Sequence, residues 1–262
     1  MHLADLIRPD WPAPDRVRAC TTTRTGGVSV GPFASLNLAA HVGDAAVAVT
    51  ANRGRLRAAL DLPAEPLWLS QVHGCGAVSA DAAAPGAPPE ADAAVSRQPG
   101  HVCAVLTADC LPVLLCDRAG TVCAAVHAGW RGLYQGVLEA TLARLGVPGA
   151  ELLAWLGPAI GPARFEVGPE VRAAFVSQEP AAACAFRAGV GDRWHADLYA
   201  LARLRLAAAG VSAVSGGGLC TASDPARFFS YRRDGVTGRM ATLIWLADGV
   251  AEAKRRREFP GA

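Results

Sequence analysis

The chain has 262 residues, and its 25 lysines and arginines nearly balance its 23 aspartates and glutamates, which leaves a formal charge of +2. This balance excludes a strongly basic chain, so the charge indicates neither a nucleic-acid partner nor a membrane-surface partner. With 52% apolar and 18% charged residues, the sequence is too hydrophobic for a disordered chain and long enough to bury a large core.

The apolar residues do not form a membrane span, which needs roughly 18 of them in an unbroken run. The longest candidate, 102–116, is interrupted by Asp109 and Pro112. The N-terminal residues lack the basic region, apolar block and cleavage site of a secretory signal. We therefore expect a cytoplasmic protein without a membrane or nucleic-acid partner, present as a monomer or a weak homo-oligomer.

The predicted elements begin after an irregular lead-in at 1–16, which is rich in prolines and aspartates. Residues 17–23 include several β-branched side chains and predict a strand that leads to a Gly-Gly turn. Residues 45–60 carry apolar side chains at helical spacing, with Asp44 as the expected N-cap. A short strand is expected at 67–74.

The second half of the chain alternates strongly apolar strands with helices. A Pro/Ala/Gly loop at 82–89 precedes them, and both of its flanks belong to the same fold. The expected strands are 102–107, 113–116, 121–126, 154–156 and 240–246, and the expected helices are 133–145, one beginning near Pro169 that covers 171–175, and 198–209. This order predicts one α/β (α+β) domain over 1–262, with mixed sheets flanked by helices, and a solvated basic tail at 250–262.

The eight cysteines are too sparse for a disulfide framework in a chain of this length, so we expect reduced thiols. No CxxC pair is present, so any metal site must be assembled from distant positions. Three cysteines lie inside apolar strand patterns and fit a structural, buried role: Cys103, Cys116 and Cys123. Cys110 differs because it lies at a break between two strands, beside Asp109.

Two of the six histidines stand out in the same way. His73 and His127 each end a buried-strand pattern, and small residues follow them, which leaves room for a ligand near the backbone. The positions of the others are more typical of a mobile terminus or of surface and capping roles: His2, His41, His101 and His195.

The combination of His73, Cys110 and His127 offers two imidazoles and a thiolate. This set matches a catalytic zinc site with three protein ligands and an open fourth position. A nucleophile-base pair of Cys110 and His127 without a metal fits the same residues, and the composition leaves both hypotheses open. A purely structural zinc site is disfavoured because such sites use four protein ligands and no fourth is evident.

Nine segments in chain order resemble the YfiH or laccase-domain family. They are 22–29 TTRTGGVS, 35–38 SLNL, 71–74 QVHG, 107–113 TADCLPV, 127–132 HAGWRG, 156–162 LGPAIGP, 165–168 FEVG, 229–234 FSYRRD and 237–239 TGR. The resemblance implies one domain with a fold similar to the catalytic domain of cytotoxic necrotizing factor. It also implies a zinc site carried by His73, Cys110 and His127.

One activity assigned to this family is copper-dependent polyphenol oxidation. A true multicopper oxidase needs roughly ten histidine ligands, and its blue-copper centre usually adds a methionine. This chain has six histidines, and its two methionines are Met1 and Met240. A full laccase centre therefore cannot be built, although a single copper on the three side chains would support weak oxidation, since Cu(II) outcompetes zinc at most nitrogen and sulfur sites.

A second activity implied by the resemblance is phosphorolysis of adenosine, inosine and methylthioadenosine to the free base and a pentose 1-phosphate, together with adenosine deamination. Zinc suits the deamination because it ionises water near neutral pH. Asp109 is the candidate proton shuttle, and a carboxylate that caps its own turn is an equally good interpretation.

Phosphorolysis also needs a phosphate site, for which the candidates are Arg24, Arg131 and Arg232. A structural ion pair explains each of them equally well. Asn37 and Gln71 are candidates for base or ribose contacts. A third role implied by the family is hydrolytic editing of a muramyl-serine cell-wall precursor, with Cys110 or activated water attacking an amide. Our leading prediction is the zinc-dependent purine nucleoside phosphorylase with adenosine deaminase activity.

Overall fold

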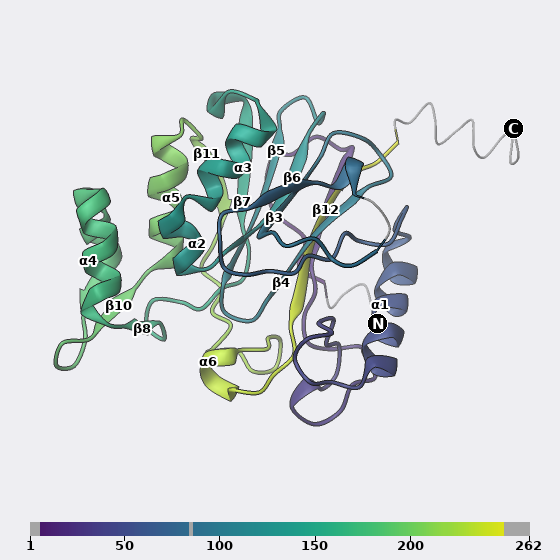
Figure 1. Cartoon of the computed structure of the whole chain (residues 1–262), viewed down its shortest axis with the longest axis horizontal. Helices are drawn as coiled ribbons and strands as arrows, with labels where there is room; N and C mark the ends of the chain where they lie inside the picture. The colour runs from purple at the N-terminus through teal and green to yellow at the C-terminus, as the bar shows by residue number, and fades with distance from the viewer. Residues whose placement is uncertain (1–5, 84–85, 249–262) are drawn as a thin grey trace, which may run out of the picture.

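Two β-sheets lie face to face at the centre of the computed structural model, which describes residues 6–83 and 86–248 (Figure 1). The larger sheet has the strand order β11-β7-β5-β6-β3-β2, the smaller has the order β1-β12-β4, and a third sheet, β8-β10-β9, is separate from both. The strands are β1 (Val17–Thr21), β2 (Ala77–Ser79), β3 (Ala93–Ser96), β4 (Val102–Thr107), β5 (Leu111–Asp117), β6 (Cys123–Ala128), β7 (Leu152–Leu156), β8 (Glu166–Val167), β9 (Phe186–Ala188), β10 (Trp194–Ala196), β11 (Ala213–Gly216) and β12 (Met240–Leu246).

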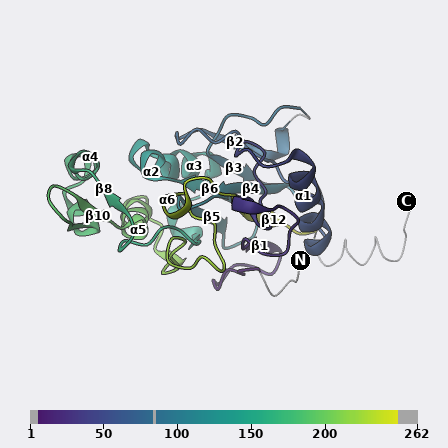
Figure 2. The same cartoon turned by 90° about the horizontal axis from the view of Figure 1, so that it is seen from below.

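Helices cover the outer faces of the two central sheets. The α-helices of the described residues are α1 (Ala46–Leu60), α2 (Trp130–Gln135), α3 (Val137–Leu145), α4 (Pro169–Gln178), α5 (Leu198–Ala208) and α6 (Tyr231–Asp234). Short 3-10 turns occur at Gly31–Phe33, Ala80–Ala82, Gly149–Glu151 and Pro180–Ala185. Helix α1 packs on the smaller sheet, whereas α2, α3 and α5 lie on the larger one (Figure 1). Helix α4 and the third sheet lie at the end of the molecule opposite α1 (Figure 2).

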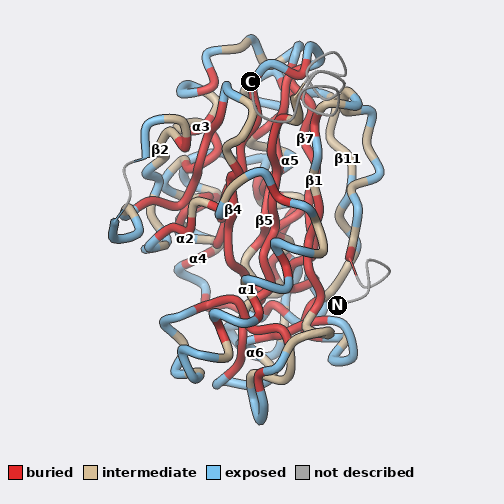
Figure 3. Tube along the Cα trace, turned by 90° about the vertical axis from the view of Figure 1, so that its right-hand side faces the viewer, coloured by how far each residue is buried: buried red, intermediate tan, exposed pale blue. Residues whose placement is uncertain are grey.

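This layering explains why the central strands are apolar along their whole length. In β4, Cys103 and Val105 face the larger sheet, whereas Ala104 and Leu106 face the side covered by α1. Both faces of the strand are therefore buried, so its residues are apolar throughout instead of alternating between apolar and polar. The buried stretches of β4 and β5 run through the middle of the molecule (Figure 3). The expectation of a single domain with mixed sheets flanked by helices is confirmed.

Most of the long elements expected from the sequence are present. The strands expected at 17–23, 102–107, 113–116, 121–126, 154–156 and 240–246 are β1, β4, β5, β6, β7 and β12, and the helices expected at 45–60, 171–175 and 198–209 are α1, α4 and α5. Cys103, Cys116 and Cys123 are buried as expected. The basic tail at 250–262 lies outside the described residues, as does part of the lead-in at 1–16.

The prediction of a strand at 67–74 is wrong. Most hydrogen bonds of this segment involve side chains rather than the backbone of a neighbouring strand. Only Leu67 and Ser70 form isolated bridges. The Gln71 side-chain amide accepts from the Leu106 backbone N–H at 2.7 Å and donates to its carbonyl at 2.9 Å. The next three backbone N–H groups point at the carboxylate of Asp92.

Two helix details also differ from expectation. The helix expected at 133–145 begins earlier, at Trp130, and is broken into α2 and α3 by Gly136, whose φ of 90° interrupts the helical path. The N-cap of α1 is Ala45 rather than Asp44. The Asp44 carboxylate accepts instead from Ser29 Oγ at 2.6 Å and from Asn37 Nδ2 at 2.9 Å. Within the described residues, no helix has the length and apolar character needed to cross a membrane.

Candidate functional site

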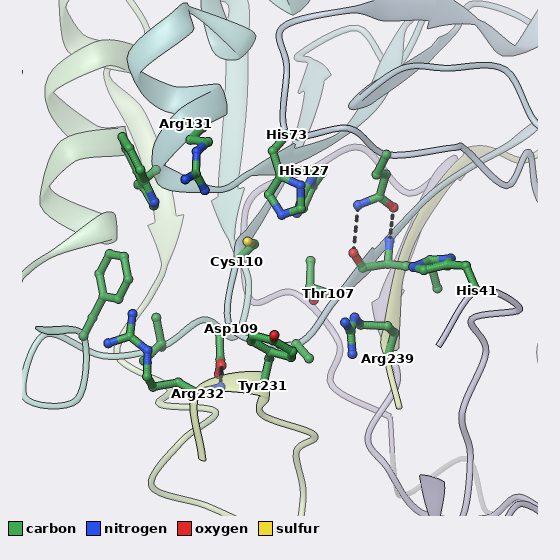
Figure 4. Close-up of a pocket in the computed structure, with 16 residues that line it drawn as sticks. His41, His73, Thr107, Asp109, Cys110, His127, Arg131, Tyr231, Arg232 and Arg239 are labelled. Carbon is green, nitrogen blue, oxygen red and sulfur yellow. Dashed lines mark hydrogen bonds between the residues drawn. The ribbon is translucent and has the colours of Figure 1, made fainter. Parts of the chain in front are cut away.

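The structure brings together the three side chains that the sequence singled out as metal ligands. His73 precedes β2, Cys110 lies between β4 and β5, and His127 lies near the end of β6. Their potential ligand atoms all lie within 4.8 Å of one another. Figure 4 shows the two imidazoles gathered above the Cys110 sulfur. We call this group the His-Cys-His site.

Strand register explains how Cys110 comes to lie beside His127. Strands β5 and β6 are antiparallel, with Leu111 opposite Ala128, so Cys110 comes opposite Gly129. A Cβ atom added to Gly129 would lie only 2.9 Å from Cys110 Sγ. The residue after Ala128 must therefore lack a side chain if the thiol is to keep its position.

The replacement Gly129→Ala is expected to lower activity at least about tenfold, because the new methyl group displaces the Cys110 thiol. The backbone itself tolerates alanine, since Gly129 has φ −68° and ψ 165°. Steady-state kinetics and metal content by mass spectrometry measure the effect. Gly76→Ala is the matched control, because its added Cβ would meet no atom closer than 3.7 Å. Wild-type activity and metal content in Gly129→Ala would contradict the steric argument.

Asp92, which the sequence analysis missed, orients both histidines. Its fully buried carboxylate lies 2.7 Å from His127 Nδ1 and accepts the backbone N–H groups of His73 and Gly74 at 3.0 and 2.7 Å. The bond to Nδ1 leaves His127 Nε2 free to bind a ligand. The bond to its backbone N–H helps to hold His73 at φ 61°. The only signal in the sequence was a carboxylate directly before a short apolar segment, which is β3 in the structure.

The Cys110 thiol and the His127 imidazole shift each other's pKa. Burial raises the pKa of Cys110, but the charges of His127 and His73 and their hydrogen bonds outweigh it and lower the pKa to about 6. Burial lowers the pKa of His127, but the Cys110 and Asp92 side chains raise it to about 9. In the absence of a metal, a thiolate and an imidazolium therefore face each other near neutral pH. The thiolate is the form of cysteine that binds metals, and metal binding releases the imidazolium proton.

The donor set fits a zinc ion with an open coordination position. Two imidazole nitrogens and one thiolate are typical zinc ligands, and the Asp92 carboxylate supplies the outer hydrogen bond that usually orients a ligating histidine. Copper also binds nitrogen and sulfur ligands, so the donor set does not select between the two metals. Within 6–83 and 86–248, this is the one group of three such side chains close enough to share an ion.

Asp109 lies directly beside the His-Cys-His site and is tied on both sides. It has φ 95° and is 8% exposed. One carboxylate oxygen accepts from Thr221 Oγ1 at 2.6 Å, and the other accepts from the Arg232 backbone N–H at 2.7 Å. The side chain therefore joins the loop before β5 to α6 and also lines the pocket above the site.

That pocket has a volume of about 500 Å³, within the range of small-molecule sites. It opens over the His-Cys-His site (Figure 4). Besides the three site residues and Asp109, the lining consists of His41, Gln71, Leu106, Thr107, Ala108, Trp130, Arg131, Ile160, Phe165, Tyr231, Arg232 and Arg239. Of the basic residues, Arg239 and His41 were missed, although the 237–239 segment that contains Arg239 was noted as a motif.

Of the predicted arginines, Arg131 and Arg232 line the pocket and Arg24 does not. The Arg131 guanidinium lies 4.6 Å from the Trp130 ring, and that of Arg232 lies 5.3 Å from the Phe165 ring. Arg24 donates instead to the carbonyls of residues 34 and 225 and stacks on Phe229. The structure therefore gives Arg24 a role in holding loops together.

The two predicted amides also bind backbone. Asn37 is fully buried, and its side chain bonds to Ala39, Asp44 and the Arg239 N–H, so it lies behind the pocket wall rather than in it. Gln71 does line the pocket, with both groups of its amide engaged by Leu106.

Comparison with known proteins identifies relatives that match nearly the whole chain. A protein of Pseudomonas aeruginosa named purine nucleoside phosphorylase is 60% identical, over 92% of this chain and 98% of its own length. The Escherichia coli purine nucleoside phosphorylase YfiH is 54% identical, over 93% of this chain and 100% of its own.

Solved structures give the same result for the fold. A Neisseria meningitidis protein superposes with a TM-score of 0.89 at 52% identity, covering 93% of this chain and 100% of its own. YlmD from Geobacillus stearothermophilus superposes with a TM-score of 0.87 at 31% identity, covering 95% and 98%.

A family model described as multi-copper polyphenol oxidoreductase laccase matches residues 18–247. This range contains every residue of the His-Cys-His site and of the pocket lining. The chain therefore belongs to this laccase-like family, the YfiH family.

Proposed function

We propose that the chain is a zinc-dependent purine nucleoside phosphorylase that cleaves adenosine, inosine or methylthioadenosine with phosphate to the free base and a pentose 1-phosphate, and that it also deaminates adenosine. What supports the proposal is the match between the name of the relatives, at 54% and 60% identity, and a pocket that combines a zinc-type donor set with several arginines. We keep the cytoplasmic location and the monomeric or weakly oligomeric state as predictions from the sequence.

Two arginine-aromatic pairs are suited to the purine base. Arg131 lies over Trp130, and Arg232 lies over Phe165. A purine is flat, aromatic and uncharged, so it gains most from stacking and from the flat face of a guanidinium. In the proposal, these residues orient the nucleoside with its ribose toward the His-Cys-His site.

The chemistry is divided between the metal site and the adjacent carboxylate. A zinc ion bound by His73, Cys110 and His127 would supply Lewis acidity at its open position. Asp109 would carry the proton that the departing base takes up, or that water gives up during deamination. The bonds from Thr221 and from the Arg232 backbone hold that carboxylate in one orientation at the pocket wall.

Copper-dependent oxidation of phenols is a second candidate, favoured by the description of the family and by the nitrogen and sulfur donors. The six histidines of the chain cannot supply a multicopper centre, so this activity would depend on a single copper at the His-Cys-His site.

The test is chromatography with mass detection on the purified protein and adenosine, with and without phosphate. The proposal predicts adenine and ribose 1-phosphate only when phosphate is present, and inosine in both samples. If folded, zinc-loaded protein formed neither product, nucleoside chemistry would be excluded. Amide hydrolysis of a muramyl-serine precursor would then become the leading hypothesis.

A further inference from the structure

We propose that Arg239, with the hydroxyl of Thr107, forms the phosphate-binding part of the pocket, on the side opposite Arg131 and Arg232. The inference rests on the proposed phosphorylase function for its biological meaning, but the anion site itself can be tested without turnover. Figure 4 shows Arg239 and Arg232 on opposite sides of the pocket.

Arg239 is a half-buried cation that forms no salt bridge within 6–83 and 86–248. Burial lowers the pKa of its guanidinium, and the charges of Cys110, Asp109 and Tyr231 only partly oppose that effect. A charge withdrawn from water is costly unless it is paired, so this guanidinium favours an anionic ligand.

Only one of the three guanidinium nitrogens of Arg239 donates a hydrogen bond within the described part of the chain. Nη1 donates to the carbonyls of Thr237 and Gly238 at 2.9 and 3.1 Å, which fixes the side chain against its own loop. No protein acceptor in the described part of the chain engages Nε or Nη2. Two free donors on a fixed, planar group match the oxygens of a phosphate.

Thr107 provides a polar group that lacks a partner beside the same arginine. It ends β4 opposite Met240, the residue that follows Arg239. Thr107 is 2% exposed, and its hydroxyl oxygen has no hydrogen-bond partner among the residues that the structure describes. The hydroxyl points toward the space between Tyr231 and Arg239 (Figure 4). A buried hydroxyl without a partner is destabilising, and a ligand oxygen would satisfy it.

The basic side chain nearest to Arg239 in the pocket lining, that of His41, carries no acidic group, so it leaves room for an anion beside Arg239. His41 also lines the pocket, and its pKa is lowered by burial and by the charges of Arg239 and Arg53. An aromatic ring lies beside the guanidinium of each pocket arginine, at 5.8 Å from that of Arg239 in the case of Tyr231. On the other side of the pocket, however, Arg131 and Arg232 are exposed, so water already stabilises their charges, whereas Arg239 is half-buried. Because a nucleoside is neutral and phosphate is an anion, the two sides suit the two substrates of phosphorolysis.

The first test is Arg239→Gln, with two readouts. In titration calorimetry with inorganic phosphate, we expect at least a tenfold loss of affinity, about the loss expected for a two-pronged charged contact. In phosphorolysis, we expect KM for phosphate to rise at least about tenfold while KM for adenosine stays within about twofold. Arg239→Lys keeps the positive charge but loses the planar pair of N–H donors, so it should bind phosphate more tightly than Arg239→Gln and more weakly than the wild type.

Thr107→Val distinguishes ligand binding from a structural role and also covers the case in which Arg239→Gln does not fold. The variant keeps the shape of the side chain and removes the unpartnered hydroxyl. We expect weaker phosphate binding, by about threefold or more, together with a melting temperature no lower than that of the wild type. A hydroxyl with a purely structural role would give lower stability and unchanged phosphate affinity.

Arg193→Gln, on an exposed loop, controls for the general loss of a positive charge. Arg131→Gln is expected to raise KM for adenosine instead of KM for phosphate. Unchanged phosphate affinity in both Arg239→Gln and Thr107→Val would overturn the inference. It would also be overturned if Cys110→Ser lost phosphate binding while Arg239→Gln kept it, because phosphate would then bind at the metal.

Failure of the proposed function gives a different pattern. Phosphate binding that depends on Arg239, in a wild-type protein that performs no phosphorolysis, would leave the anion site intact and remove only its assignment to nucleoside cleavage.

Discussion

The Cys110→Ala variant is expected to lose at least about a thousandfold in kcat/KM for phosphorolysis and to retain little metal. The replacement removes the one thiolate donor of the His-Cys-His site and leaves two imidazoles that cannot hold a zinc ion with comparable affinity. Cys110 is a half-buried side chain in the loop just before β5, so its truncation should change the free energy of unfolding by only about 1 kcal/mol relative to metal-free wild type. Kinetics, metal content and thermal unfolding are measured on the same preparation.

Cys220→Ala is the matched control for this experiment. Cys220 is also partly exposed, and hydrogen bonds lower its pKa although burial opposes them, but it does not line the pocket. The control should keep wild-type kinetics and metal content. If Cys110→Ala kept its metal and more than a tenth of the wild-type activity, the His-Cys-His site would not be the reaction centre. If it kept its metal but lost activity, Cys110 would act as a nucleophile rather than as a ligand.

The sequence predicted the long buried strands well because a strand that is dry on both faces is apolar throughout. Strand β12 begins and ends where its apolar run does, at Met240 and Leu246, and β4 occupies 102–107 as expected. The short strands β2, β3 and β8 to β11 were missed. They contain two to four residues, so they are too short for an alternation of apolar and polar residues to be recognised in the sequence.

The His-Cys-His site was predictable because its members interrupt otherwise regular patterns. Cys110 lies where one apolar strand stops and the next begins, and small residues follow each histidine. Asp92 and Arg239 were not predicted, because what distinguishes them is their environment. Asp92 matters because the 72–74 backbone folds over it, and Arg239 matters because no acidic side chain in the described part of the chain forms a salt bridge with it. Neither property can be read from local sequence.

The position of Asp92 leads to the second large effect, that of Asp92→Asn. Both carboxylate oxygens receive hydrogen-bond donors: Oδ1 faces His127 Nδ1 and the His73 N–H, and Oδ2 faces the Gly74 and Val72 N–H groups. An asparagine must turn its NH₂ toward one of these sets, where a donor would meet donors. We expect a loss of about 2–4 kcal/mol in the free energy of unfolding.

The same change should disturb metal binding through His127. If the NH₂ group faces Nδ1, the ring must accept there, and the proton moves to Nε2, the nitrogen that is otherwise free to bind a metal. Loss of an orienting partner of this kind typically lowers metal affinity or activity by about 10- to 100-fold. Competition with a chelator of known affinity measures the first quantity, and kinetics on the folded fraction measures the second.

Asp117→Asn separates the effect on the site from the effect on stability. Asp117 is also a buried aspartate, 5% exposed, and accepts from Thr121 N, Thr121 Oγ1 and Val122 N, but it lies at the far end of β5 from Cys110. The Asp117→Asn variant should lose a similar amount of free energy of unfolding and should keep the metal affinity of the wild type. If Asp92→Asn and Asp117→Asn behaved alike in metal affinity, Asp92 would be a structural carboxylate. If only Asp92→Asn released the metal, the buried carboxylate would be part of the site, because it sets which nitrogen of His127 faces the pocket.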